Sequence, residues 1–134
     1  MIKRLGIFMG SGFLFGGLLG FVPGVVKDDM YFGIFMVNTP HNILHLVSGA
    51  IFLIASMIGA GAARLWFQLF GLVYAGMAAW GFQVGDGIIC GVISNNQNDS
   101  WGHAALALGM LLIGFALPRQ MSTSRKVRYA GNDR

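Results

Sequence analysis

Residues 40–61 have the sequence PHNILHLVSGAIFLIASMIGAG, an uncharged and mainly apolar run. The hydrocarbon core of a bilayer is about 30 Å thick, and roughly 20 apolar helical residues are needed to cross it. Thr39 is suited to cap a helix here, and Pro40 is suited to its first position, where no amide hydrogen is required. The stretch therefore predicts a transmembrane helix that begins near residue 40.

The rest of the chain contains more runs of the same kind. Three of them are long enough to span a bilayer, at about residues 5–26, 65–84 and 101–117. Charged or polar segments separate these runs, and Pro118 ends the last one because proline cannot continue a helix. We therefore expect an all-α fold, a four-helix transmembrane bundle formed by residues 1–118, followed by a basic cytoplasmic tail at 119–134.

The composition excludes an ordinary water-soluble domain. Hydrophobic residues make up 55% of the 134 residues and charged residues 10%, whereas a soluble domain carries about 25% charged residues. The formal net charge of +4 comes from scattered short clusters rather than from one basic face. Nucleic acid is therefore not expected as a partner.

The distribution of charge predicts the orientation, because cytoplasmic loops collect lysine and arginine. With the four spans above, most basic residues fall on one side: Lys3, Arg4, Arg64, Arg119, Arg125, Lys126 and Arg128. The other side carries Lys27 with four aspartates, Asp28, Asp29, Asp86 and Asp99. We expect both termini to be cytoplasmic, and Cys90, the single cysteine, to face the outer side.

Recurring residues suggest an internal repeat. Gly10, Gly20, Phe21 and Gly24 recur at a constant offset as Gly71, Gly81, Phe82 and Gly85, and at a slightly smaller offset His45, Gly49 and Leu53 recur as His103, Ala107 and Leu111. Each half then contains two spans, and the second half enters the membrane as the first does. The expected arrangement is two helical hairpins in a parallel repeat.

The first span carries a ladder of small residues at intervals of four: Gly12, Gly16, Gly20 and Gly24. Small residues let helix backbones approach closely in lipid, where no hydrophobic force drives helices together. The ladder is predicted to pack helices, either within the bundle or against a second copy or another membrane subunit.

Three histidines are the main candidates for chemistry. His41 and His45 are one turn apart on one helix face, and His103 begins the fourth span at a similar depth. In a sequentially connected bundle the second and fourth helices are diagonal and face each other across the core. His45 and His103 could ligate a haem iron, and with His41 a divalent metal, while one histidine could hold a chlorophyll magnesium. The sequence favours a structural role over these, in which a histidine caps a helix, bonds a loop carbonyl or pairs with Asp99 or Asp86.

Two segments carry a family resemblance: NTPHNILHLVSG at residues 38–49 and NDSWGH at residues 98–103. The chain resembles, over residues 5–118, an uncharacterised bacterial family of small four-span membrane proteins with a His-Asn-x-x-His helix opening. The resemblance implies the fold and a bacterial plasma membrane or related internal membrane, and it implies no substrate. Its characteristic positions are His41, Asn42, His45, Gly49 and His103.

These observations favour a non-enzymatic membrane protein, a small subunit or accessory factor of a larger complex. Its expected partners are lipids and either other membrane subunits or further copies of the chain. The alternative is a module that binds haem, chlorophyll or a divalent metal through the histidines. A transporter or channel is disfavoured because the spans carry no aspartate or glutamate to serve as a relay. No residue is predicted to be catalytic.

Overall fold

The computed structural model describes residues 1–118, and the tail expected at 119–134 lies outside them. The described chain folds into four long helices: α1 Ile2–Leu19, α2 Thr39–Ile58, α3 Ala60–Val84 and α4 Gln97–Leu111. A π-helical turn, η1 (Leu112–Ala116), extends α4. Each helix, α4 together with η1, is long and apolar enough to cross a membrane. The predicted four-helix transmembrane fold is therefore confirmed.

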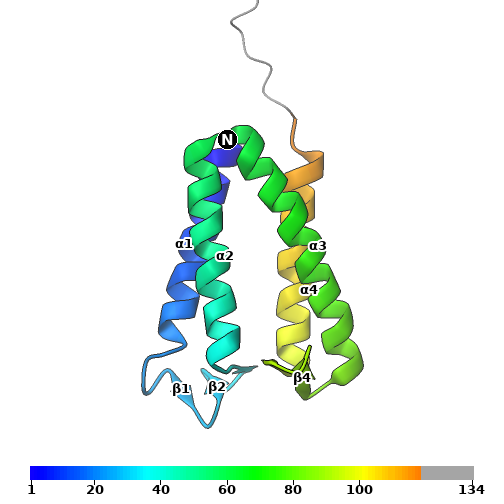
Figure 1. Ribbon diagram of the computed structural model, residues 1–134. Helices are drawn as coiled ribbons and strands as arrows, with labels where there is room; N and C mark the ends of the chain where they lie inside the picture. Colours follow the sequence, from blue (N-terminus) through cyan, green and yellow to red (C-terminus); the bar gives the residue numbers. More distant parts are fainter. Residues whose placement is uncertain (119–134) are drawn as a thin grey trace, which may run out of the picture.

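The helices form two hairpins, in which α1 packs mainly against α2 and α3 mainly against α4. Gly59 alone separates α2 from α3. The two hairpins meet at this end, drawn at the top of Figure 1, and diverge toward the other end. Two short antiparallel sheets lie at that other end and connect the helices of each hairpin.

The two sheets differ in size. The first has three strands in the order β1 (Val26–Lys27), β2 (Met30–Tyr31) and β3 (Phe35–Met36), and the second pairs β4 (Gly87–Ile89) with β5 (Ile93–Asn95). Cys90 lies exposed in the β4–β5 turn. The run at residues 30–37, which is apolar but too short to span a membrane, forms β2 and β3.

The helix ends differ from the predicted spans. The first span was expected at 5–26, but α1 ends at Leu19, and residues 20–25 form turns around Pro23. The cap of α2 is Asn38 rather than Thr39, since the Asn38 side chain accepts a hydrogen bond from the His41 backbone N–H at 3.0 Å. Thr39 and Pro40 then occupy the first turn, where backbone donors have no partner within the helix.

The core lies where the two hairpins meet. Its fully buried side chains include Phe52, Phe67, Tyr74 and Met110. The Phe52 and Phe67 rings have centroids 4.9 Å apart, which is within the range of favourable aromatic pairs.

Glycines bring α1 and α2 into close contact, and only one of them, Gly20, belongs to the predicted ladder. A β-carbon added at any of four glycines would lie about 3.0 Å or less from an atom of α2: Gly6, Gly10, Gly17 and Gly20. A β-carbon on Gly12 or Gly24 would meet nothing within 4 Å, and on Gly16 only His45 Nδ1 at 3.9 Å. Of the four ladder glycines only Gly20, just after the end of α1, packs tightly against α2. The ladder is therefore not one packing stripe inside the chain, and its packing against a second copy or another subunit stays a prediction.

Equivalent contacts recur in the two hairpins, as the predicted repeat requires. Gly20 and Gly81 correspond in the repeat, and each carbonyl accepts from an asparagine, from Asn42 Nδ2 at 2.8 Å and from Asn95 Nδ2 at 3.3 Å, although the two asparagines do not correspond. The Phe13 ring packs edge-on against His45 with centroids 5.3 Å apart. Tyr74 packs in the same way against His103 at 5.4 Å.

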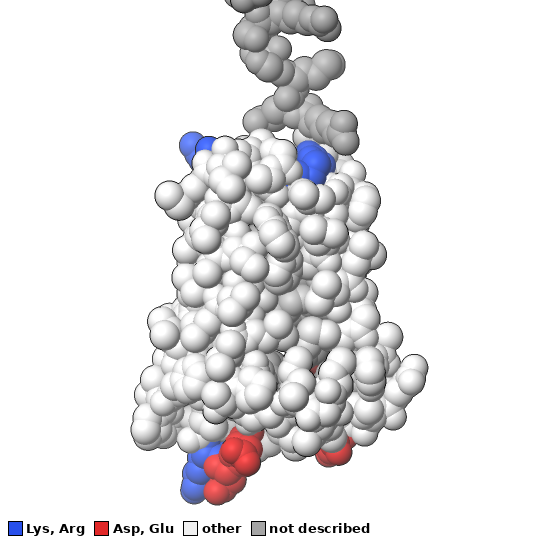
Figure 2. Space-filling model, viewed as in Figure 1, with Lys and Arg blue, Asp and Glu red and all other residues white. Residues whose placement is uncertain are grey.

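Charges separate along the length of the bundle. Lys3, Arg4 and Arg64 lie at the end where α1 and α3 begin, and Asp28, Asp29 and Asp86 lie in the loops at the other end (Figure 2). This distribution is the one from which the orientation was predicted. The sidedness and the identity of the membrane stay predictions.

Candidate metal centre

The two halves are joined at the loop end by reciprocal hydrogen bonds. Asn38 Nδ2 donates to the Val92 carbonyl at 2.8 Å, and Asn96 Nδ2 donates to the Ile34 carbonyl at 2.8 Å. These two bonds are equivalent in the repeat, because the sequence offset between His45 and His103 also separates Asn38 from Asn96 and Ile34 from Val92. Each half therefore supplies the asparagine that binds the loop of its counterpart.

A second reciprocal pair lies closer to the bundle axis. The His41 ring approaches the Ser94 carbonyl with Nδ1 at 3.1 Å, and the Asp99 carboxylate accepts from the Met36 backbone N–H with Oδ2 at 2.9 Å. The same offset relates His41 to Asp99 and Met36 to Ser94. Both side chains stand in the first turn of a helix and reach across to the opposite half.

Side-chain caps fix these helix starts. Asn38 caps α2, and Asn96 caps α4 in a reciprocal box, where the Asn96 side chain accepts from the Asp99 N–H and Asp99 accepts from the Asn96 N–H, both at 2.9 Å. Such boxes satisfy donors that a helix start leaves without partners. They also fix the position of Asp99 in α4, as the cap of α2 does for His41.

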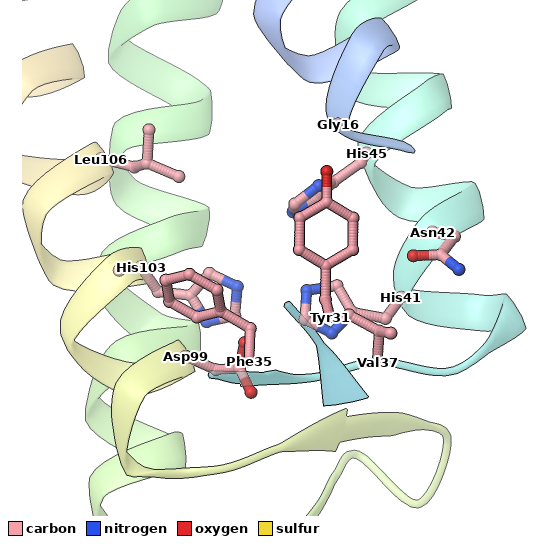
Figure 3. A pocket seen from close by; sticks show the side chains of 11 residues that line it. Gly16, Tyr31, Phe35, Val37, His41, Asn42, His45, Asp99, His103 and Leu106 are labelled. Carbon is pink, nitrogen blue, oxygen red and sulfur yellow. The ribbon is translucent and has the colours of Figure 1, made fainter. Parts of the chain in front are cut away.

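The three predicted histidines converge, as Figure 3 shows. One nitrogen from each of His41, His45 and His103 lies within 4.8 Å of the other two. The His41 ring centroid is 5.0 Å from that of His45 and 5.6 Å from that of His103. His41 and His103 are only 2% and 3% exposed. The prediction that α2 and α4 face their imidazoles toward each other is thus confirmed in geometry.

Hydrogen bonding leaves nitrogen atoms of this cluster free to act as ligands. Because the Ser94 carbonyl can only accept, His41 Nδ1 carries the hydrogen and its Nε2 is left with a lone pair. Among the described residues, His45 Nε2 and His103 Nδ1 are buried without any hydrogen-bond partner. Unpaired buried polar atoms are rare and destabilising. Two of the three rings thus carry a buried nitrogen that no group of the described residues satisfies, as do the buried hydroxyls of Ser48, Ser56 and Tyr74.

Asp99 belongs to the same cluster, although it was not among the ligands predicted from the sequence. It lines the cavity with the three imidazoles. Its Oδ2 accepts from two backbone N–H groups, and within residues 1–118 its Oδ1 has no such partner. The signal that could have found it is the repeat, because the offset from His45 to His103 leads from His41 to Asp99.

A cavity of about 240 Å³ adjoins the cluster, and loop residues cover it. Tyr31 and Phe35 come from the first sheet, Val37 follows it, and Gly16 and Leu106 form the wall on α1 and α4. Burial raises the pKa of the Tyr31 phenol, so it stays protonated and can donate a hydrogen bond. Gly16 is the ladder glycine that contributes here, since a larger side chain would fill space beside His45.

The size of the cavity bears on which ligand it suits. Pockets for drug-sized molecules typically measure about 300–1,000 Å³, and this one is smaller. The His41 ring also packs against those of His45 and His103, and one nitrogen of His45 lies within 4.8 Å of one of His103, so the gap between these two rings is narrow. A single ion suits this space better than a haem or chlorophyll ring.

Comparison with known proteins identifies the family. No curated protein and no solved structure matches the chain. The model of a domain of unknown function, DUF4383, matches residues 3–116 and thus nearly all of the described part. The chain therefore belongs to the DUF4383 family of uncharacterised proteins.

Proposed function

We propose that this membrane protein binds a single first-row transition-metal ion, such as Zn²⁺ or Cu²⁺, through His41, His45 and His103. The observation that carries the proposal is the approach of one nitrogen from each ring to within 4.8 Å of the others. In a tetrahedral zinc site with Zn–N distances of about 2.0–2.1 Å, the ligand nitrogens are about 3.4 Å apart. Side-chain rotations that shorten the distances between these nitrogens by at most about 1.4 Å would give that geometry.

The chemistry of the donors selects the class of metal. Imidazole nitrogen is a preferred ligand of zinc, copper, nickel and iron, whereas calcium and magnesium require several oxygen ligands. Asp99 is the one carboxylate among the residues that line the cavity. It can supply a fourth ligand or balance the charge of the ion. Three nitrogens with one carboxylate favour a transition metal over a hard cation.

The surroundings of the ligands support the same assignment. Metal-binding histidines commonly donate their second ring hydrogen to a carbonyl, and this bond holds the ring and sets its tautomer. The bond from His41 to Ser94 is of that kind, and the backbone donors from Met36 and Asn96 hold Asp99 in a similar way. The ion would join the two hairpins at the end where they diverge.

Metal titration of the purified protein tests this proposal. The chain contains only three histidines, so it is purified through an affinity tag without histidine and stripped with a chelator. Co²⁺ is the spectroscopic probe, and Zn²⁺ competes for it. We expect one ion per chain with the absorption of a tetrahedral site, and loss of that absorption in His45→Gln and His103→Gln.

A matched control separates the site from its surroundings. Asn98→Ala removes an exposed hydrogen bond to the Ile34 carbonyl near the site but no ligand, and its Co²⁺ spectrum should match that of the wild type. The proposal fails if the wild type binds no Co²⁺ or Zn²⁺, or if the histidine variants bind as tightly as the wild type. A Soret band in the protein as isolated would favour the haem alternative.

A non-enzymatic accessory role in a larger membrane complex stays a prediction, and one observation favours it. Gly12 is exposed on α1 and meets no side chain of the described residues, so this face can receive another helix. Crosslinking in the native membrane through a cysteine introduced at Gly12 tests this role, in a background where Cys90 is replaced by serine. A protein that stays monomeric and uncrosslinked would contradict it.

A further inference from the structure

A second cavity lies at the opposite end of the bundle, where α1 and α3 begin. It measures about 440 Å³ and is lined by the first residues of α1, by the start of α3 and by the chain after η1. Its polar side chains are Arg64 and Gln68, both on α3. The histidine cluster is at the other end, so this cavity is independent of the proposed metal site.

The positive charge of Arg64 has no acidic partner at this end of the described chain. Its guanidinium donates to two neutral carbonyls, to Gly114 through Nη1 at 2.9 Å and to Pro118 through Nη2 at 3.2 Å. Gln68 donates to the same Gly114 carbonyl, which lies in η1, at 3.0 Å. A guanidinium has five N–H donors, so further donors remain. Figure 2 shows the aspartates of the described residues gathered at the other end.

The helix starts beside Arg64 supply backbone N–H groups, while the carbonyl ends of α2 and η1 lie at the same end of the bundle. Neither α1 nor α3 has a side-chain cap or an acidic residue in its first turn. By contrast, asparagine side chains cap α2 and α4 at the other end. An uncapped helix start presents free N–H groups and the positive end of the helix dipole, a combination that suits phosphate and carboxylate ions.

We propose that this cavity binds a phosphate anion between the Arg64 guanidinium and the first turn of α3. Arginine forms bidentate bonds to phosphate, which a neutral carbonyl cannot replace. The anion has two sources, the headgroup of an anionic phospholipid and free phosphate. Ile2, Leu65 and Leu117 border the cavity with apolar side chains at the end of the spans, where a lipid headgroup would lie.

The test places a competing charge in the cavity without removing Arg64. Gly61 lines the cavity, and a β-carbon there would meet nothing within 4 Å. In Gly61→Asp the new carboxylate would occupy the anion position. An acidic residue in the first turn also stabilises the helix, so loss of binding would not result from unfolding. Gly61→Asn is the matched control, with nearly the same size and no charge.

Binding is measured on the full chain in mild detergent with three probes: phosphatidylglycerol, phosphatidylcholine and inorganic phosphate. We expect wild-type protein to bind phosphatidylglycerol about tenfold more tightly than phosphatidylcholine, and Gly61→Asp to remove most of this preference, while Gly61→Asn retains it. Competition by millimolar inorganic phosphate would assign a free anion, and its failure to compete would assign the lipid headgroup. Equal binding of the two lipids with no binding of phosphate, or a wild-type preference in Gly61→Asp, would overturn the proposal.

Discussion

Gly49→Ala tests the packing of α1 on α2, on which the position of His45 depends. A β-carbon at residue 49 would lie 2.7 Å from the Gly10 carbonyl oxygen and 2.8 Å from the Leu14 backbone nitrogen. Non-bonded heavy atoms prefer separations of about 3.5–4.0 Å, so the helices must move apart by about 0.7 Å or more. The obstructing atoms are backbone, and they cannot rotate away as a side chain would.

The expected magnitude follows from two opposing effects. Overpacking of this kind destabilises a protein by about 1–3 kcal/mol, and contact with backbone on the facing helix places this site in the upper part of that range. Alanine gains up to about 1 kcal/mol over glycine in a helix. We therefore expect Gly49→Ala to lower the free energy of unfolding by about 1–2 kcal/mol.

The assay is reversible unfolding in mixed detergent micelles, followed by circular dichroism. Gly12→Ala is the matched control, because a β-carbon on Gly12 would meet nothing within 4 Å, and its stability should equal or slightly exceed that of the wild type. If the two variants unfold alike, or if Gly49→Ala is the more stable, the close approach of α1 to α2 is refuted.

Three further predictions concern the site and the topology. Zn²⁺ at about 100 times its Kd should raise the free energy of unfolding by about 2.7 kcal/mol. This gain should disappear with a chelator or as the pH falls, because protonated imidazoles cannot bind metal. Thermal unfolding at several pH values measures the gain, and a gain that survives in acid would contradict the prediction. Asp99→Ala should lower stability by about 1–2 kcal/mol, since it removes the bonds that the carboxylate accepts from Asn96 in the capping box of α4 and from Met36. Denaturation without metal tests this, and a neutral effect would contradict the reciprocal bonds. Cys90, exposed in the β4–β5 turn, should react with a membrane-impermeant maleimide added to the outer face of intact cells, and labelling only after the inner face is opened would reverse the predicted orientation.

The positions of the four helices could be predicted from the sequence, but the end of α1 could not. Uncharged runs of sufficient length mark segments that lipid can surround, whatever their detailed packing. Phe21 and Val22 extend the apolar run beyond Leu19, although the chain already turns there. The hydropathy of a segment indicates whether lipid or water can surround it, but it does not indicate where the hydrogen bonds of its helix end.

The meeting of the histidines could be predicted because it depends on helix periodicity and on the repeat. The covering of the cavity by Tyr31 and Phe35 could not, since strands of two residues leave no recognisable alternation in a sequence. The contact face of α1 was also missed. It depends on which glycines meet the backbone of α2, and a spacing of four residues alone does not determine that face.

The reciprocal bonds at the loop end have a consequence for assembly. Each hairpin donates hydrogen bonds to loop carbonyls of the other hairpin, as two identical hairpins related by a twofold axis would do. Opening the covalent link at Gly59 would therefore leave two fragments whose mating surfaces are intact. Co-expressed as separate polypeptides, they should recombine in the bilayer into the same four-helix unit, while either fragment alone would lack the acceptors that complete it.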